Sequence, residues 1–153
     1  MELIHTSPAP ISTINSNGRF GDFLFFAAAE YVMTAAKGHV TYSLEQDEDR
    51  IIDAEQMFYH ENAAALAPLV ERVMGMVGCD EDTAEELIAQ RTDVHAIDAN
   101  IEAEDLAEVS WDIQRITGEA AVALGFQGVS MNDEQGRAML IKMTGREGEL
   151  ALV

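Results

Sequence analysis

Cysteine is nearly absent from this sequence of 153 residues, in which Cys79 is the only one. An internal disulfide is therefore excluded, as is a zinc site built on paired cysteines. We interpret Cys79 as inert, because the acidic run at 80–82 should raise the pKa of its thiol. The N-terminal residues lack the basic and apolar segments of a secretory signal, and no apolar run reaches the roughly 20 residues of a membrane helix. We expect a cytoplasmic protein that does not contact membranes.

Basic residues are also scarce, with 9 Lys and Arg against 28 Asp and Glu and a net charge of −19. Because phosphate contacts require an excess of Lys and Arg, we expect no direct binding of nucleic acid. The acidity has two interpretations. It could serve only to keep the protein soluble, or it could attract a basic partner, including a protein that itself binds nucleic acid. Charge alone does not choose between them.

Several enzyme signatures are missing as well. The sequence contains no Gly-rich phosphate loop of either common spacing and no HExxH motif, and the acid-rich segment 80–86 lacks the ligand spacing of an EF-hand. These absences weigh against P-loop and Rossmann nucleotide binding, zinc peptidase activity and calcium binding.

What the sequence does contain is a helical block between two blocks of strands. Period-two and apolar runs predict strands at 2–6, 22–27, 39–45, 51–52, 128–131, 138–143 and 149–153. Apolar spacings of three and four predict helices at 28–36, 66–77, 82–91 and 102–124, with Asp82 and Glu85 as a capping box and a turn at 132–136. This order predicts one α+β domain over residues 1–153, with an antiparallel-rich sheet and a helical segment at about 61–124.

One candidate for chemistry lies at the end of the first predicted strand, in the stretch LIHTSP. A histidine at a strand end, followed by two hydroxyl residues and Pro8, can present its ring at the mouth of a cleft while the flanking main chain stays free to bind a ligand. His5 is therefore a candidate ligand-binding residue. The ordinary interpretation is a structural histidine in the core or at the surface.

Two further stretches contain candidate residues. Residues 20–31 form an aromatic-rich strand that leads to Tyr31, and residues 125–136 end in the adjacent carboxylates Asp133 and Glu134. We expect Phe23, Phe25 and Phe26 to divide between the two faces of the sheet as core residues. Carboxylates in a turn are usually solvated turn formers, so neither stretch identifies a site alone.

Taken together and in this order, the three stretches resemble the ADP-ribosyltransferase fold of the diphtheria-toxin and poly-ADP-ribose polymerase type. In that fold a histidine with a small or hydroxyl pair ends the first strand, a later stretch supplies a tyrosine, and an acid near the last strands completes the site. The phrases HTSP, FFAAAEYVMT, CDEDTAEELI and GFQGVSMNDEQG resemble more closely the phage-encoded anti-CRISPR ADP-ribosyltransferases that act on the type I-F surveillance complex. The resemblance implies a split sheet with a helical insertion and NAD as co-substrate.

The resemblance also implies roles for individual residues. His5 would bind a ribose hydroxyl, the main chain at Thr6 would hold the carboxamide, and Tyr31 would stack on the nicotinamide. Asp133 would stabilise the positive charge that develops on the ribose and deprotonate the nucleophile, with Glu134 as the rival acid. The remaining residues assigned to NAD binding are Ser7, Phe25 and, for the pyrophosphate, Arg19. The family commonly has Gly where this chain has Thr6 and Glu where it has Asp133.

The implied function is transfer of ADP-ribose to a basic, DNA-reading subunit of the type I-F complex in the host cytoplasm. Two alternatives remain open on the sequence. The first is a non-enzymatic acidic inhibitor that mimics nucleic acid, which explains the charge of −19 equally well but gives no reason for the order of His5, Tyr31 and Asp133. The second is an NAD-dependent toxin with another host protein as target.

Overall fold

The computed structural model describes residues 2–7, 23–28, 40–97, 101–133 and 136–152. Within these ranges seven strands form a single sheet in the order β4-β5-β6-β2-β1-β3-β7. The strands are β1 (Glu2–Ser7), β2 (Phe23–Ala28), β3 (Val40–Glu45), β4 (Ile51–Asp53), β5 (Gly128–Asp133), β6 (Gly136–Lys142) and β7 (Ala151–Leu152). The pair β4 and β5 is parallel, and the other pairs are antiparallel. The predicted α+β class with an antiparallel-rich sheet is confirmed.

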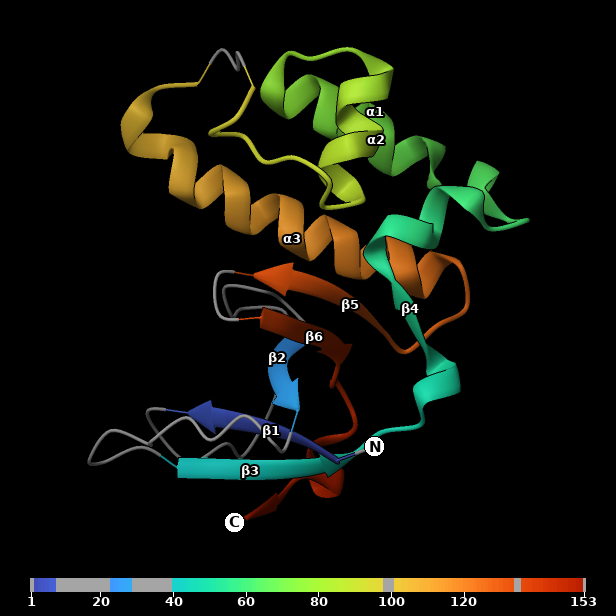
Figure 1. Ribbon diagram of the computed structural model, residues 1–153, viewed down its shortest axis with the longest axis vertical. Helices are drawn as coiled ribbons and strands as arrows, with labels where there is room; N and C mark the ends of the chain where they lie inside the picture. Colours follow the sequence, from blue (N-terminus) through green and yellow to red (C-terminus); the bar gives the residue numbers. More distant parts are fainter. Residues whose placement is uncertain (1, 8–22, 29–39, 98–100, 134–135, 153) are drawn as a thin grey trace.

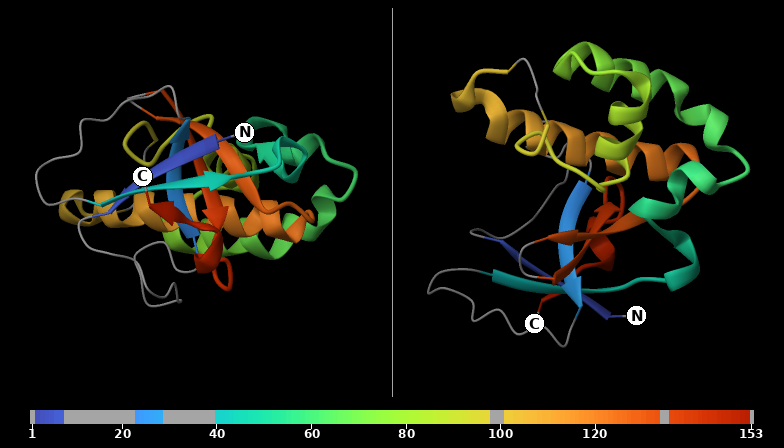
Figure 2. Two further views of the ribbon diagram at one scale, coloured as in Figure 1. Left: turned by 90° about the horizontal axis from the view of Figure 1, so that it is seen from below. Right: turned by 45° about the horizontal axis from the view of Figure 1, so that its top comes forward.

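The helices follow β4 and precede β5 in the chain. They are α1 (Ala67–Val77), α2 (Glu81–Ile88) and α3 (Leu106–Ala123), and short 3-10 turns η1 (Glu48–Arg50), η2 (Ala54–Tyr59), η3 (Ala63–Leu66), η4 (Ala103–Asp105) and η5 (Glu147–Glu149) connect elements. Figure 1 shows α3 lying against β5 and β6, with α1 and α2 beyond it. The right view of Figure 2 also shows these helices on one side of the sheet. The helical block therefore covers one face of the sheet.

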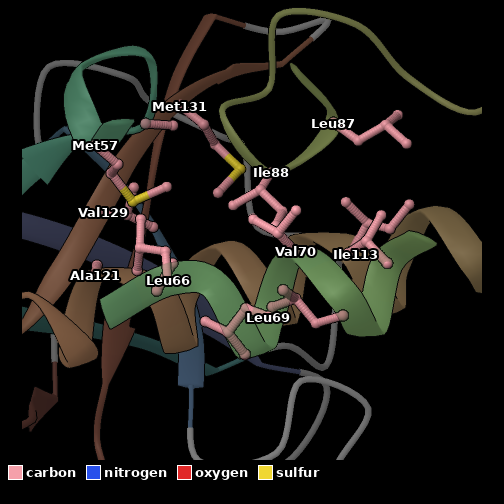
Figure 3. Close-up of a cluster of buried hydrophobic side chains, with 14 of the residues drawn as sticks. Met57, Leu66, Leu69, Val70, Leu87, Ile88, Ile113, Ala121, Val129 and Met131 are labelled. Carbon is pink, nitrogen blue, oxygen red and sulfur yellow. The ribbon is translucent and has the colours of Figure 1, made fainter. Parts of the chain in front are cut away.

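The main hydrophobic core lies between this helical block and the sheet. Figure 3 shows side chains from η2, η3, α1, α2, α3 and β5 converging there. Among them, Met57, Leu66 and Ile88 are fully buried. The buried residues of η3 and α1 have the three-and-four spacing that predicted the helix, so the amphipathic pattern and the core coincide there; they are Leu66, Leu69, Val70, Val73 and Val77.

A second, smaller cluster occupies the opposite face of the sheet. It consists of buried side chains from four strands and the residue just after β6, namely Leu3, Phe26, Leu44, Met139, Ile141 and Met143. On β2 the aromatic residues divide as predicted: Phe23 and Phe25 pack with the main core, and Phe26 packs with the second cluster. This division follows from the alternation of side chains along a strand.

The sheet is split between β1 and β2. All six residues of β1 pair with β3, whereas the pairing of β1 with β2 consists of Leu3 with Ala28 and Ile4 with Ala27. Figure 1 accordingly shows β1 and β3 below β5 and β6, with β2 running between the two groups. The described part of the sheet therefore divides into a β4-β5-β6-β2 group and a β1-β3-β7 group that are joined by a short contact.

Several predicted boundaries were wrong by a few residues, and two of them are instructive. The helix predicted at 28–36 lies outside the described residues except for Ala28, which ends β2. Helix α2 begins one residue after Asp80, whose carboxylate accepts a hydrogen bond from the Thr83 N–H, so Asp80 and not Asp82 is its N-cap. Strand β5 extends through Asp133, because Asn132 pairs with Arg137 and Asp133 with Gly136, where a turn was expected. Both Asp80 and Asp82 are suitable N-cap residues, and the hydrogen bond to Thr83 identifies Asp80 as the cap. Residues 132 and 133 can form a turn or extend a strand, and their pairing with β6 makes them part of the strand.

Gly118 provides a test of the packing of α3 on the sheet. A Cβ at Gly118 would lie 2.9 Å from Phe23 Cε1 and 3.0 Å from Leu140 Cδ2. We expect Gly118→Ala to lower the free energy of unfolding by about 1–3 kcal/mol, because overpacking outweighs the gain in helix propensity of roughly 1 kcal/mol. Gly75→Ala is the matched control, since Gly75 is exposed on α1 and its Cβ would meet nothing within 4 Å.

Urea unfolding followed by circular dichroism measures both changes. The control variant should gain about 0.5–1 kcal/mol from helix propensity alone. Equal stabilisation by the two substitutions would show that α3 does not approach β2 and β6 as closely as described.

Candidate functional site

His5 lies half-buried on β1 and makes a hydrogen bond across the split. Its Nδ1 is 2.6 Å from the carbonyl oxygen of Phe25 on β2. Because a carbonyl can only accept, Nδ1 carries the proton, and the neutral ring is left with Nε2 as an acceptor. No described residue is hydrogen-bonded to Nε2. The ring is thus held in one tautomer with one acceptor available.

The surroundings of His5 favour the neutral ring. Burial lowers the pKa of His5, and the hydrogen bond to the Phe25 carbonyl opposes this effect only in part. The ring of Phe26 lies beside it, with centroids 5.6 Å apart and planes inclined by 55°. Since the unperturbed pKa of histidine is about 6.5, His5 is neutral at pH 7 and suited to accept a hydrogen bond from a hydroxyl.

Because the pKa of His5 is lowered in the folded protein, the free energy of unfolding should decrease as the pH falls. As pH falls below about 6.5, the unfolded chain binds a proton at His5 before the folded chain does, so stability is lost. We expect His5→Asn, which does not titrate, to show a smaller decrease of the free energy of unfolding between about pH 7.5 and about pH 5.5. Urea unfolding of both proteins at the two pH values measures it, and parallel decreases would contradict it.

The described ladder between β1 and β2 stops next to His5. Thr6 and Ser7 pair with Thr41 and Val40 of β3, but β1 has no ladder partner on its β2 side beyond Ile4 among the described residues. The His5 side chain bridges to β2 at the point where the ladder stops. Among the described residues, the main chain of β1 beyond Ile4 therefore has no strand partner on the β2 side, which is where the sequence predicted that the main chain at Thr6 binds a ligand.

The departure from Gly at Thr6 has no conformational cost. Thr6 lies in a regular strand opposite Thr41, and among the described residues the one non-glycine residue with positive φ is Gln90. A glycine at this position would therefore matter only for how closely a ligand approaches the main chain.

The structure describes some of the other candidate residues and not others. Asp133 is the last residue of β5, and Figure 1 shows the C-terminal ends of β1 and β5 on the same side of the molecule. Phe25 is half-buried against the main core, and its carbonyl rather than its ring contacts His5. Tyr31, Arg19 and Glu134 lie outside the described residues. The structure thus joins His5 to Phe25 and leaves the remaining roles as predictions.

One polar pair near Asp133 was not singled out from the sequence. Arg137 on β6 donates from Nη2 to the hydroxyl oxygen of Ser130 on β5 at 3.1 Å, and Ser130 is completely buried. The sequence does contain one signal for this residue. The chain has only 9 basic residues, and one of them, Arg137, directly follows the NDEQG stretch that contains the candidate acids.

The described residues offer no second candidate site at Cys79 or at a metal-binding cluster. Burial, followed by the negative charge of Asp80, raises the pKa of Cys79, in agreement with its interpretation as inert. In the ranges that the structure describes, no group of three His, Cys, Asp or Glu side chains could hold a metal ion. None of the described helices is both long and apolar enough to cross a bilayer.

The mixed α+β fold with its antiparallel-rich sheet agrees with the ADP-ribosyltransferase-type fold that the sequence resemblance implies. The sequence model of the family described as anti-CRISPR type I-F ADP-ribosyltransferase AcrIF11 matches residues 1–146. The chain belongs to this family, and it is an NAD-dependent ADP-ribosyltransferase.

A similar solved structure is a crystal structure of an anti-CRISPR protein, with a TM-score of 0.58 and 26% identity over 92% of this chain and 88% of that one. No curated protein matches the sequence. Membership of an ADP-ribosyltransferase family decides against one alternative left open by the sequence, the non-enzymatic nucleic-acid mimic.

Proposed function

We propose that this protein transfers ADP-ribose from NAD to a protein subunit of a type I-F CRISPR surveillance complex and thereby blocks recognition of target DNA in the host cytoplasm. The observation that carries the proposal is the fixed tautomer of His5 at the opening between β1 and β2, in a chain of this family. This arrangement puts a hydrogen-bond acceptor next to a stretch of β1 that has no described ladder partner on its β2 side.

The binding roles follow from the donors and acceptors available. Nε2 of His5 accepts a hydrogen bond from a hydroxyl of the nicotinamide ribose, because the Phe25 carbonyl fixes the proton on Nδ1. The main chain at Thr6 and Ser7 holds the carboxamide of the nicotinamide. Tyr31 stacks on the nicotinamide ring, which orients the leaving group.

The reaction breaks the bond between the ribose C1′ and the nicotinamide nitrogen, and nicotinamide leaves with the electron pair. The ribose passes through an oxocarbenium-like state, whose positive charge the carboxylate of Asp133 stabilises. A nucleophile on the target forms the new bond to C1′, and Asp133 accepts its proton and passes it to solvent. Glu134, the neighbouring residue, is the rival for this role.

Charge suits the proposed target. The net charge of −19 favours approach to a basic, DNA-reading subunit, and the attached ADP-ribose adds negative charge that opposes phosphate binding there. We further propose that residues 1–153 act as one domain, in which the helical segment between β4 and β5 is an insertion into the transferase fold.

Incubation of the purified complex with the protein and labelled NAD tests this function. We expect label on one subunit, an intact mass raised by one ADP-ribose unit, and loss of target-DNA binding in a mobility-shift assay. Omission of NAD is the matched control, since a non-enzymatic inhibitor would still block DNA binding without it. Absence of label on every subunit would overturn the proposal.

A further inference from the structure

Tyr59, at the end of η2, is one of two strongly exposed large hydrophobic side chains in the described part of the chain. It keeps 72% of its surface exposed, and the other, Leu152 on β7, keeps 71%. The two differ in their surroundings, because a charged side chain from another element lies over the ring of Tyr59. Tyrosine and arginine in contact at a surface are typical of the centres of protein interfaces.

That charged side chain is Arg91, which is held by two elements. Its guanidinium carbon is 5.1 Å from the centre of the Tyr59 ring. Its Nη2 donates to the carbonyl oxygen of Glu55 on η2 at 2.7 Å, and its Nη1 is 3.6 Å from a carboxylate oxygen of Glu86 on α2. The guanidinium therefore makes a cation–π contact that it cannot leave without losing a hydrogen bond.

The turn that leads into Arg91 contains a strained residue. Helix α2 ends in a Schellman motif, in which the N–H of Arg91 donates to the Glu86 carbonyl at 3.0 Å and that of the preceding residue to the Leu87 carbonyl at 3.1 Å. That preceding residue is Gln90, whose φ of 59° is one that glycine usually supplies. Its amide donates to the hydroxyl of the buried Thr117 on α3 at 3.1 Å. A strained residue that a buried partner holds in place favours a functional role for the turn, which positions Arg91.

The main chain on both sides of Tyr59 is also fixed. Met57, two residues before it, is fully buried in the main core. His60, the next residue, packs edge-on against the ring of Phe126, with centroids 5.7 Å apart, and its Nδ1 accepts a hydrogen bond from the N–H of Asn62 at 3.0 Å. The ring of Tyr59 is thus presented to solvent in an ordered position, so covering it costs little conformational entropy.

The residues around Tyr59 and Arg91 are acidic. Exposed carboxylates belong to η2, to its two flanks and to α2 beside Arg91; they are Asp53, Glu55, Glu61 and Glu86. We call these four acids, together with Tyr59 and Arg91, the Tyr59 surface. Its single guanidinium leaves it negative, in a chain with a net charge of −19. It would therefore repel nucleic acid or a second copy of this chain and attract a basic protein.

We propose that the Tyr59 surface docks a basic surface of the protein that becomes ADP-ribosylated, with an arginine or lysine of this target lying on the open part of the Tyr59 ring. This inference rests on the proposed function, which makes a basic subunit the target. The ring provides the platform for the cation, and the acids steer the target toward it. None of the residues assigned to NAD or to transfer belongs to η2 or α2, so docking and chemistry can be measured separately.

Binding of the purified type I-F complex and the kinetics of transfer test this docking role. Tyr59→Ala should weaken binding in surface plasmon resonance and raise KM for the complex by about tenfold to a hundredfold, while kcat changes by less than about threefold. Its affinity for NAD, measured by calorimetry, should equal that of the wild type. Tyr59→Phe keeps the ring and should bind the complex within about threefold of the wild type.

Arg91→Ala separates the docking role from a general effect of charge, because the two predict opposite signs. If charge alone attracted the target, removal of a cation from an acidic surface would strengthen binding. If Arg91 holds the ring in its binding position, its removal should weaken binding by about threefold to tenfold, although the protein becomes more negative.

Leu152→Ala is the matched control, since it removes the other exposed large side chain, from β7 at the sheet edge opposite β4. It should change binding and KM by less than about twofold. A Tyr59→Ala variant that behaves like this control would overturn the inference, as would tighter binding by Arg91→Ala. Failure of the proposed function is a different result, since the wild type would then label no subunit of the complex.

Discussion

Asp133→Asn should lower kcat/KM for ADP-ribose transfer by about 10²- to 10⁴-fold, the largest loss expected from any single substitution in this protein. The amide keeps the size of the side chain but removes the negative charge that stabilises the ribose cation and the base that accepts the proton of the nucleophile. Asp133 is at the end of β5 and pairs with Gly136, so the substitution lies at the edge of the ladder. We therefore expect the stability of the fold to change by less than about 1 kcal/mol.

Glu134→Gln is the matched control for this prediction. It also removes one negative charge, from the neighbouring residue, so a general electrostatic effect on NAD or target binding would be equal in both variants. We expect Glu134→Gln to retain activity within about threefold of the wild type. Release of nicotinamide and labelling of the target measure the two halves of the reaction. The opposite ranking of the two variants would transfer the catalytic role to Glu134.

The large elements of the fold were predictable because their periodicity is local. Apolar spacing of three and four along α1 placed that helix to within one residue, and Gly78, which ends it, has the positive φ of 74° that favours glycine. Alternation along β2 predicted that its aromatic residues divide between two faces, and they do. Patterns of this kind depend on neighbours a few residues apart, which a sequence displays directly.

The contacts that define the site depend on long-range pairing and were not predictable in the same way. The hydrogen bond of His5 joins residues 20 positions apart, and it exists because the ladder between β1 and β2 stops after Ile4. The sequence indicated that His5 ends a strand but not which atom would accept from it. The bond of Arg137 to Ser130 likewise requires the register of β5 with β6, and the expected turn at 132–136 concealed that register.

His5→Asn should lower kcat/KM by about tenfold to a hundredfold with little change in stability, and it separates the two functions of the histidine. The amide nitrogen of asparagine occupies nearly the position of Nδ1, so it can still donate to the Phe25 carbonyl. The variant has nothing in the position of Nε2, however, and loses the acceptor for the ribose hydroxyl. His5→Ala should lose both functions, with an additional decrease of about 1–2 kcal/mol in the free energy of unfolding.

An NAD analogue that lacks the contacted hydroxyl of the nicotinamide ribose provides the decisive comparison. The wild type should discriminate against one deoxy analogue by about the factor lost in His5→Asn, and His5→Asn should discriminate much less, because the partner of the missing hydroxyl is already gone. If the loss caused by His5→Asn and the loss caused by removing a hydroxyl were additive for every hydroxyl of the ribose, Nε2 would not bind the ribose. A His5→Asn variant as active as the wild type would lead to the same conclusion. In that case the hydrogen bond to Phe25 would serve only to close the split between the two groups of strands, and the residue that orients the ribose would have to lie elsewhere on the opening beside β1.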